Sequence, residues 1–273
     1  MTQAEKGRRF RALHQRDEAF IIPNPWDAGT ACLLAHLGFE ALATTSAGYA
    51  FSVGKRDGTI GRDETLEHVA AIASATDLAV SADLENGFGD TPESVAETIK
   101  LVAQAGAVGG SIEDSFRNGQ ESELYALERA VDRVRAAAEA ARRLPFQFTL
   151  TARAENYLVG KRDLKDAVKR LQAYQNAGAD VLYAPGLTSN NDIATVIGSV
   201  DRPVNVLMGL QGVQLPLAAL SAIGVKRVSV GSALSRAALG AFLRAAQEMR
   251  QHGTFTFAEQ AISYRDISAM FPA

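Results

Sequence analysis

The chain has 273 residues, of which 47% are hydrophobic and 22% are charged, and this composition predicts one globular domain over residues 1–273. A formal net charge of −3 and the lack of a long basic run argue against nucleic acid as a partner. No apolar run approaches the length of a membrane span, so we expect no membrane partner. The single cysteine, Cys32, excludes an internal disulfide framework and favours a cytoplasmic location.

Apolar runs typical of strands alternate along the chain with helical patterns. The first half predicts a helix at 3–15, a strand at 18–22, a helix at 26–37, a strand at 40–46, a polar loop at 52–62, a helix at 63–76, a strand that opens the stretch 79–89, a helix at 92–105 and a strand at 108–114. The second half predicts a polar loop at 116–123, a helix that runs to 143, a strand at 146–156, a helix at 163–177, a strand at 180–186, a helix at 190–198, a strand at 203–209, a helix at 214–222, a strand at 226–233 and helices at 234–251 and 256–269.

Several helix ends carry residues suited to them. Asn24 is expected to cap the helix that Pro25 begins, and Asp63 and Thr91 are expected as the caps of two later helices. Gly178 ends a helix because glycine readily adopts the left-handed backbone conformation found there.

Eight short strands, each followed by a helix, predict a parallel sheet. Over this length they favour an α/β fold of the (β/α)8 TIM-barrel type, with an N-terminal helix and extra C-terminal helices, of which 254–273 form an extension. A doubly wound open sheet is the alternative. The first strand lacks the glycine-rich turn GxGxxG, which argues against a dinucleotide-binding version of that fold.

The stretch AVSADLENGFG, residues 79–89, ends an apolar strand with two acids, Asp83 and Glu85. Hard oxygen ligands at this spacing suit Mg²⁺, and Mn²⁺ is also compatible. The alternative is a strand that simply ends in a polar, solvated loop.

Polar residues also follow the other strands, and in a barrel these ends meet at one mouth. The candidates are Thr45, Ser46, Ala47, Asp83, Glu85, Glu113, Asp114, Arg153 and Asn205. Clustered carboxylates repel one another unless a cation or protons neutralise them, so a divalent metal with a bound anion is the economical interpretation. Arg153 suits a carboxylate or phosphonate, which its fork of donors would clamp. The alternative is a set of scattered loop charges with local partners.

These residues resemble the isocitrate lyase / phosphoenolpyruvate mutase superfamily over nearly the whole chain. The similar segments are TTSAGYAFSVGKRDG, DLENGFG, SIEDS and TARAENYL. The resemblance implies Mg²⁺ bound directly by Asp83, and held mainly through water by Asp57, Glu85 and Glu113. It also implies that the backbone amides of Ser46 and Ala47 bind an α-oxo acid and that Arg153 binds its carboxylate.

Three departures separate this chain from the branches of that superfamily. The lyases carry a Lys-Cys-Gly-His loop, whereas residues 116–120 read FRNGQ and contain neither cysteine nor histidine. The mutases carry a longer Lys-Arg-Asn-Ser loop, which only Arg117-Asn118 echoes. The lyases also place a glutamate after strand six, where this chain has Tyr183-Ala184-Pro185-Gly186. The metal and pyruvate half of the site is therefore expected to persist, with a different group cleaved.

We therefore expect a Mg²⁺-dependent lyase that cleaves a C–C bond next to a small α-oxo or α-hydroxy carboxylate through a pyruvate enolate. Oxaloacetate decarboxylation and methylisocitrate-lyase-like cleavage are the examples. One alternative is C–P chemistry, as in a phosphonopyruvate hydrolase or phosphoenolpyruvate mutase, and another is a non-catalytic binder of α-oxo acids. The resemblance also implies a homotetramer, a dimer of dimers, with C-terminal helices exchanged between paired subunits.

Overall fold

A computed structural model describes residues 1–118, 121–213 and 215–271. Eight parallel strands form its central sheet: β1 (Phe20–Ile22), β2 (Ala41–Ala43), β3 (Ala79–Asp83), β4 (Gly109–Glu113), β7 (Thr149–Arg153), β8 (Val181–Tyr183), β9 (Val204–Leu207) and β10 (Arg227–Ser229). Their order is β1-β10-β9-β8-β7-β4-β3-β2. The first and last strands of this order meet where the Ala43 N–H donates to the Pro23 carbonyl over 3.0 Å, which closes the sheet into a (β/α)8 barrel. The predicted fold is confirmed.

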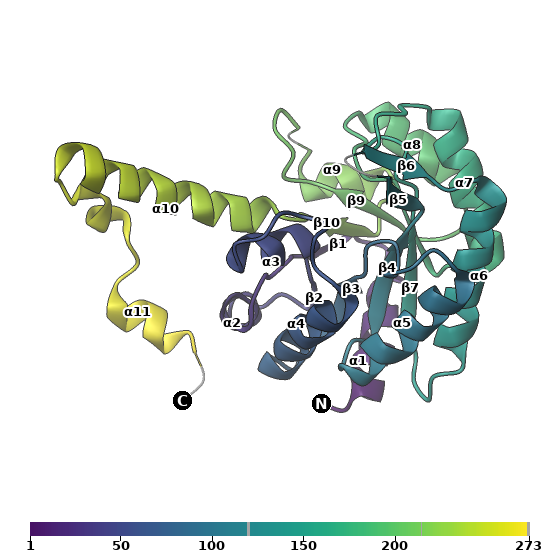
Figure 1. Cartoon of the computed structure of the whole chain (residues 1–273), viewed down its shortest axis with the longest axis horizontal. Helices are drawn as coiled ribbons and strands as arrows, with labels where there is room; N and C mark the ends of the chain where they lie inside the picture. The colour runs from purple at the N-terminus through teal and green to yellow at the C-terminus, as the bar shows by residue number, and fades with distance from the viewer. Residues whose placement is uncertain (119–120, 214, 272–273) are drawn as a thin grey trace.

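Helices surround this barrel (Figure 1). They are α1 (Gln3–Leu13), α2 (Ala28–His36), α3 (Ser46–Ser52), α4 (Arg62–Ala75), α5 (Pro92–Gln104), α6 (Leu127–Arg142), α7 (Leu164–Ala177), α8 (Asn190–Gly198) and α9 (Leu217–Ala222). The remaining helices, α10 (Ala233–His252), the 3-10 helix η1 (Thr256–Gln260) and α11 (Tyr264–Ala269), extend away from it. The largest apolar core lies between the strands and helices such as α5 and α6. There Ile99, Val102 and Val134 are almost fully buried. Burial of each such side chain contributes roughly 1.5–3 kcal/mol.

Two predicted helix caps are wrong. The helix after β1 begins later than expected, and its cap is Asp27, whose carboxylate accepts from the Thr30 N–H over 2.7 Å. Asn24 instead ties strand ends together, since its side-chain oxygen accepts from the Val230 and Gly231 amides at 2.9 Å each. Asp63 lies inside the first turn of α4, where its negative charge favours the positive end of the helix dipole.

The predicted polar loop at 116–123 contains an antiparallel hairpin made of β5 (Ser115–Asn118) and β6 (Glu121–Leu124). Gly119 and Gln120 lie outside the described residues. In Figure 1 this hairpin stands at the carboxyl end of the barrel strands. It therefore occupies the position of a cover over the barrel mouth.

The C-terminal segment leaves the barrel as an arm, which we define as residues 233–271. Helix α10 projects away from the barrel. The chain then turns back, so that α11 lies below α10 in the view of Figure 1. The single helix predicted at 256–269 is wrong, because η1 and α11 are separate pieces. The end of the predicted 254–273 extension, residues 272–273, lies outside the described residues. Among the described helices, none is long and apolar enough to cross a membrane.

Candidate active site

Two adjoining cavities open at the carboxyl ends of the strands. The outer cleft has a volume of about 490 Å³ and the inner cavity about 210 Å³. Four residues line both: Ser46, Asp57, Arg153 and Leu158. Of the ten residues that the sequence predicts for the site, all but Asp114 line one cavity or the other, namely Thr45, Ser46, Ala47, Asp57, Asp83, Glu85, Glu113, Arg153 and Asn205. The structure therefore brings them together, as barrel topology predicts.

Arg153 lies at the centre of the carboxylates. Its guanidinium contacts Asp83 at 3.0 Å, Glu113 at 3.2 Å and Glu155 at 2.8 Å. The Arg153 side chain is 13% exposed, so these pairs are largely shielded from water. Such shielding strengthens each charge interaction and orients the side chain. Arg153 is thus preorganised, and an incoming carboxylate has to compete with the acids of the protein for its donors.

Glu155 is a member of this cluster that the predicted site did not include. It follows Arg153 by two residues, so both side chains lie on the same face of the extended chain. Its own amide donates to the Asp114 carboxylate over 2.8 Å, which fixes the backbone at this point. The TARAEN motif was enough to predict this neighbour, because alternation along a strand places the side chains of Arg153 and Glu155 on one face.

Ser46 links the end of β2 to the acids of β3. Its amide and its hydroxyl both donate to one oxygen of Asp83, over 3.2 and 3.0 Å. The Ser46 hydroxyl also lies 3.4 Å from Asp57, which the loop before α4 carries to the cleft. Burial, together with the negative charge of Asp83, raises the pKa of Asp57.

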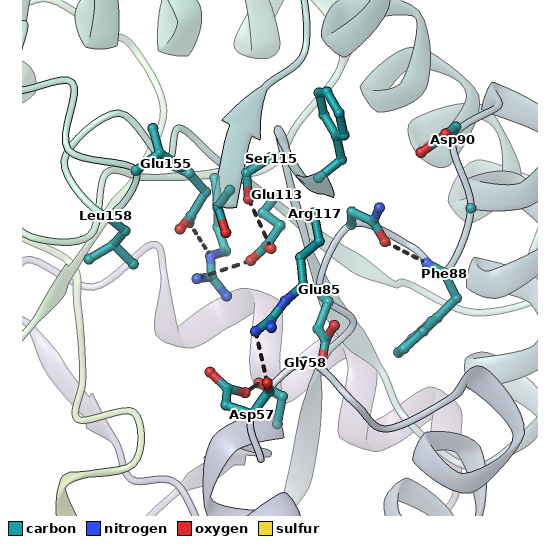
Figure 2. A pocket seen from close by; sticks show the side chains of 17 residues that line it. Asp57, Gly58, Glu85, Phe88, Asp90, Glu113, Ser115, Arg117, Glu155 and Leu158 are labelled. Atoms are coloured by element: carbon teal, nitrogen blue, oxygen red, sulfur yellow. Dashed lines mark hydrogen bonds and ion pairs between the residues drawn. The ribbon is translucent and has the colours of Figure 1, made fainter. Parts of the chain in front are cut away.

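Arg117 reaches from the hairpin to this loop, where its guanidinium donates to the Asp57 carbonyl over 2.8 Å (Figure 2). Gly58 makes this approach possible. A Cβ atom at that position would collide with the Arg117 guanidinium, and the backbone of Gly58 has a φ of +70°. The hairpin and the Asp57 loop are thus joined across the outer cleft.

Glu85 is the most unusual acid in the site. Its backbone has a φ of +47°, a conformation that residues other than glycine rarely adopt. One of its carboxylate oxygens is buried and has no hydrogen-bond partner in the described residues. Burial, followed by the charges of Asp83 and Asp57, raises the pKa of Glu85 to about 7. A strained backbone that holds an unsatisfied acid among other acids indicates a place for a cation.

Glu113 shares this environment. Burial raises the pKa of Glu113 well above its usual range, although the guanidinium of Arg153 opposes that rise. The Ser115 hydroxyl donates to one of its oxygens over 3.1 Å. This carboxylate is therefore held in place on the β4 side of the cleft.

Asp114 does not reach the barrel mouth, so its prediction as a mouth acid is wrong. Adjacent residues in an extended chain point to opposite faces, and Glu113 takes the inner one. Asp114 instead pairs with Arg170 over 3.0 Å and accepts a hydrogen bond from the Tyr174 hydroxyl. This buried hub supports the site from behind through the amide of Glu155.

Among the described residues, no three acid, histidine or cysteine side chains form a ready-made metal cage. Mg²⁺ does not require one, because it keeps several waters and is usually held by one or two carboxylates. The acidic donors present are all hard carboxylate oxygens. A cation would give the buried oxygen of Glu85 the partner that it lacks among the described residues. The residues thus fit a hydrated divalent ion near Asp83.

Thr45 and Asn205 line the inner cavity but are engaged with the protein. The Thr45 hydroxyl caps α3 by accepting from the Gly48 amide over 3.2 Å. The Asn205 side chain accepts from Arg227 over 2.8 Å and donates to Ser229 over 2.9 Å. Arg227 also lines this cavity and was missed, although a cation inside the apolar run KRVSVGSA was a visible signal.

The chain is similar to known proteins over nearly its whole length. A solved structure from Burkholderia cenocepacia J2315, provisionally named as a lyase/mutase, is 63% identical with a TM-score of 0.96, over 99% of this chain and 97% of that one. The oxaloacetate decarboxylase of Chromohalobacter salexigens is 29% identical, over 88% of this chain and 84% of that protein. A phosphonopyruvate hydrolase solved with oxalate and Mg²⁺ is 25% identical with a TM-score of 0.86, over 99% of this chain and 95% of that one.

The family described as phosphoenolpyruvate phosphomutase matches residues 10–250 of this chain. This match spans the barrel and most of α10, and therefore includes every residue of the two cavities. The chain belongs to the phosphoenolpyruvate phosphomutase family, within the isocitrate lyase / phosphoenolpyruvate mutase superfamily of lyases and mutases.

Proposed function

We propose that the protein is a Mg²⁺-dependent lyase that cleaves a C–C bond next to the carboxylate of a small α-oxo or α-hydroxy acid. The pyruvate part of the substrate leaves as an enolate, as in oxaloacetate decarboxylation or methylisocitrate-lyase-like cleavage. The observation that carries this proposal is the acid cluster around Asp83, in which one buried oxygen of Glu85 has no partner in the part of the chain that the structure describes. Similarity to an oxaloacetate decarboxylase supports the reaction class.

The ion would be held by Asp83 directly, with Asp57, Glu85 and Glu113 around it. When bound, Mg²⁺ supplies positive charge that stabilises an enolate oxygen and neutralises the surrounding acids. A hydrolase relative with bound Mg²⁺ supports this choice of ion, and Mn²⁺ would satisfy the same donors.

The protein's own groups orient the substrate. Ser46 and Ala47 occupy the first turn of α3, where backbone N–H groups have no partner within the helix. These donors suit the developing oxygen charge of an enolate, since they are preorganised and partly shielded from water. The Ser46 amide, which donates to Asp83 over 3.2 Å, would share its hydrogen bond with the enolate oxygen. Arg153 holds the carboxylate of the substrate by exchanging one or more of its internal carboxylate partners for it.

The hairpin limits the access of water to the outer cleft. Phe116 and Arg117 line the cleft, and Phe116 stacks on Tyr125 at the base of the hairpin with ring centroids 4.7 Å apart. Exclusion of water strengthens the charge interactions and protects an enolate from random protonation. The hairpin thus takes the place of the lyase loop without supplying its cysteine.

A second candidate is C–P bond chemistry, and Arg117 is the observation that favours it. This cation lines the outer cleft beside Asp57, where it could receive the phosphonate of a phosphonopyruvate-like substrate. The similarity to a phosphonopyruvate hydrolase points in the same direction. A non-catalytic binder of α-oxo acids would keep the inner cavity and the ion but show no turnover.

Pyruvate release tests these alternatives directly. It is measured with coupled lactate dehydrogenase for oxaloacetate, methylisocitrate, 2,3-dimethylmalate and phosphonopyruvate, first with Mg²⁺ and then with a chelator. We expect release from a C–C substrate that stops on chelation and in the Asp83→Ala variant. Release with inorganic phosphate from phosphonopyruvate alone would favour the second candidate. Full activity in Asp83→Ala would overturn the site.

We also propose that subunits pair through the arm and form a homotetramer. The arm carries exposed apolar side chains that a lone subunit leaves in water, including Phe242, Phe255 and Tyr264. Burial of this face against another copy would remove it from solvent.

A further inference from the structure

The inside of the barrel beneath the candidate active site is polar. Barrels of this type usually fill this space with branched apolar side chains. Here the inward positions that line the inner cavity include Ser81, Ser111, Asn205 and Ser229. These hydroxyl and amide groups make the inner cavity, of about 210 Å³, suitable for a polar group of a ligand.

Arg227 borders this cavity at the amino end of β10 and is 4% exposed. Its guanidinium donates to Asn205 over 2.8 Å and to Thr151 over 2.9 Å, and it contacts Nε2 of His14 at 3.3 Å. His14 follows α1, the helix at the amino end of the barrel strands. Arg227 therefore forms the floor of the inner cavity, opposite the mouth.

All three hydrogen-bond contacts that Arg227 makes with the described residues are with neutral groups. Burial lowers the pKa of His14 to about 3, so its ring is uncharged at neutral pH. Its Nδ1 donates to the Phe10 carbonyl over 2.8 Å, which leaves Nε2 as the acceptor for Arg227. Asn205 and Thr151 carry no charge. These contacts use three of the five N–H bonds of the guanidinium.

The charge of Arg227 has no counter-charge in the described chain. Burial lowers the pKa of Arg227 to about 10, which still leaves it protonated at neutral pH. No carboxylate of the described residues forms an ion pair with it, whereas Arg153 has three such partners and Arg170 has two. Buried charges in proteins are normally paired, because an unpaired one is costly. An unpaired guanidinium that borders a cavity thus indicates a site for an anion.

We propose that Arg227 receives a carboxylate of the substrate at the floor of the inner cavity. The substrate is then a small dicarboxylic acid, with one carboxylate at Arg227 and the other near Arg153 at the mouth. This inference rests on the proposed function for its reaction and specifies the substrate class. Arg153 would have to release a further carboxylate of the protein for each group that it received, whereas Arg227 has no carboxylate of the described residues to release.

Malate and lactate form a matched pair of probes. Both are 2-hydroxy acids, and malate carries one additional carboxylate. Isothermal titration calorimetry with Mg²⁺ measures the dissociation constant of each, with both enantiomers of malate tested. We expect the wild-type protein to bind one form of malate at least tenfold more tightly than lactate. Arg227→Met, which keeps the length of the side chain and removes its charge, should abolish that preference and change lactate binding less than threefold.

A second variant protects the test against a failure of Arg227→Met to fold. Asn205→Asp keeps the shape of the side chain and places a carboxylate where Arg227 already donates over 2.8 Å. An internal ion pair then satisfies the guanidinium, and the preference for malate should fall at least tenfold. A wild-type protein without the preference, or a folded variant that keeps the wild-type preference, would overturn the proposal.

Binding of uncleaved acids separates this inference from the proposed function. If no substrate in the pyruvate assay reacts but the malate preference depends on Arg227, the reaction is wrong and the anion site stands. If pyruvate release is Mg²⁺-dependent but the preference for malate does not depend on Arg227, the proposed reaction stands and the second carboxylate does not lie at the floor of the inner cavity.

Discussion

At the scale of single residues, the site is defined by charges that the described protein groups do not balance. Glu85 and Arg227 show this in opposite senses: among the described residues, one buried oxygen of Glu85 has no hydrogen-bond partner, and the buried Arg227 has no ion-pair partner. Each arrangement costs folding free energy that a ligand of the opposite charge recovers. A site built in this way selects ligands whose charge is opposite to that of the unbalanced side chain.

Glu85 makes a measurable prediction about pH. Because the pKa of Glu85 is raised to about 7 in the folded chain, the folded state binds more protons than the unfolded state between roughly pH 4.5 and 7. The contribution of Glu85 to stability is therefore present at low pH and is lost as the pH rises through this window. The quantity to follow is the free energy of unfolding of Glu85→Gln minus that of the wild type, measured with a chelator present. We expect this difference to rise by about 1–3 kcal/mol in favour of the variant between pH 5 and pH 8.

Urea unfolding at the two pH values measures this difference. Excess Mg²⁺ serves as the control, because an ion beside Glu85 should stabilise the wild type at pH 8 more than the variant. A stability difference that is the same at both pH values would show that the pKa of Glu85 is not raised in the folded protein.

At the scale of elements, the Asp114 hub joins three strand ends. Asp114 contacts Arg170 and Tyr174 of α7 and the amide of Glu155 after β7, and its own carbonyl accepts from the Tyr125 amide at the base of the hairpin. Arg170 also donates to the Tyr125 carbonyl over 3.1 Å. The hub thus ties the hairpin and the Arg153 strand to one helix.

Removal of one hydroxyl from this hub should destabilise the protein. Tyr174→Phe leaves the buried Asp114 carboxylate without one of its donors, and we expect a loss of about 1.5–3 kcal/mol in the free energy of unfolding. Tyr157→Phe is the matched control, since it removes a hydroxyl from a half-buried ring of the neighbouring loop and should stay within about 0.5 kcal/mol. Urea denaturation compares the two, and equal losses would contradict a special role for the hub.

The strand ends were predictable from the sequence because apolar runs that stop at acids have few other interpretations. The same alternation rule separates Glu113 from Asp114 and joins Arg153 to Glu155, so the local pattern contained more than the prediction used. The β5–β6 hairpin was not predictable in this way. Its strands, SFRN and ESEL, are mostly polar, and Phe116 and Leu124 alone are too few to give a period-two pattern. The environment of Arg227 depends on His14 and Thr151, which only the folded chain brings to it.

At the scale of the whole molecule, the barrel is self-contained and the arm is not. Ser235 is the only buried residue of the 20 in α10, all of which the structure describes. A helix in water draws most of its stability from packing of an apolar face, and α10 packs very little on its own barrel. Figure 1 shows α10 away from the barrel, and the proposed pairing of copies would supply the second surface against which it packs.

Phe242 is the residue with which to test this arrangement, because it is 66% exposed in the middle of α10. We expect Phe242→Asp to break the contact between copies, since burial of an unpaired carboxylate in an apolar interface costs several kcal/mol. Size-exclusion chromatography with light scattering should give about four times 29.0 kDa for the wild type and a smaller assembly for the variant. Gln247→Asp adds the same charge at an exposed polar position of α10, on another side of the helix, and should leave the mass unchanged. A monomeric wild type, or a Phe242→Asp variant of wild-type mass, would show that the exposed face of the arm serves another purpose.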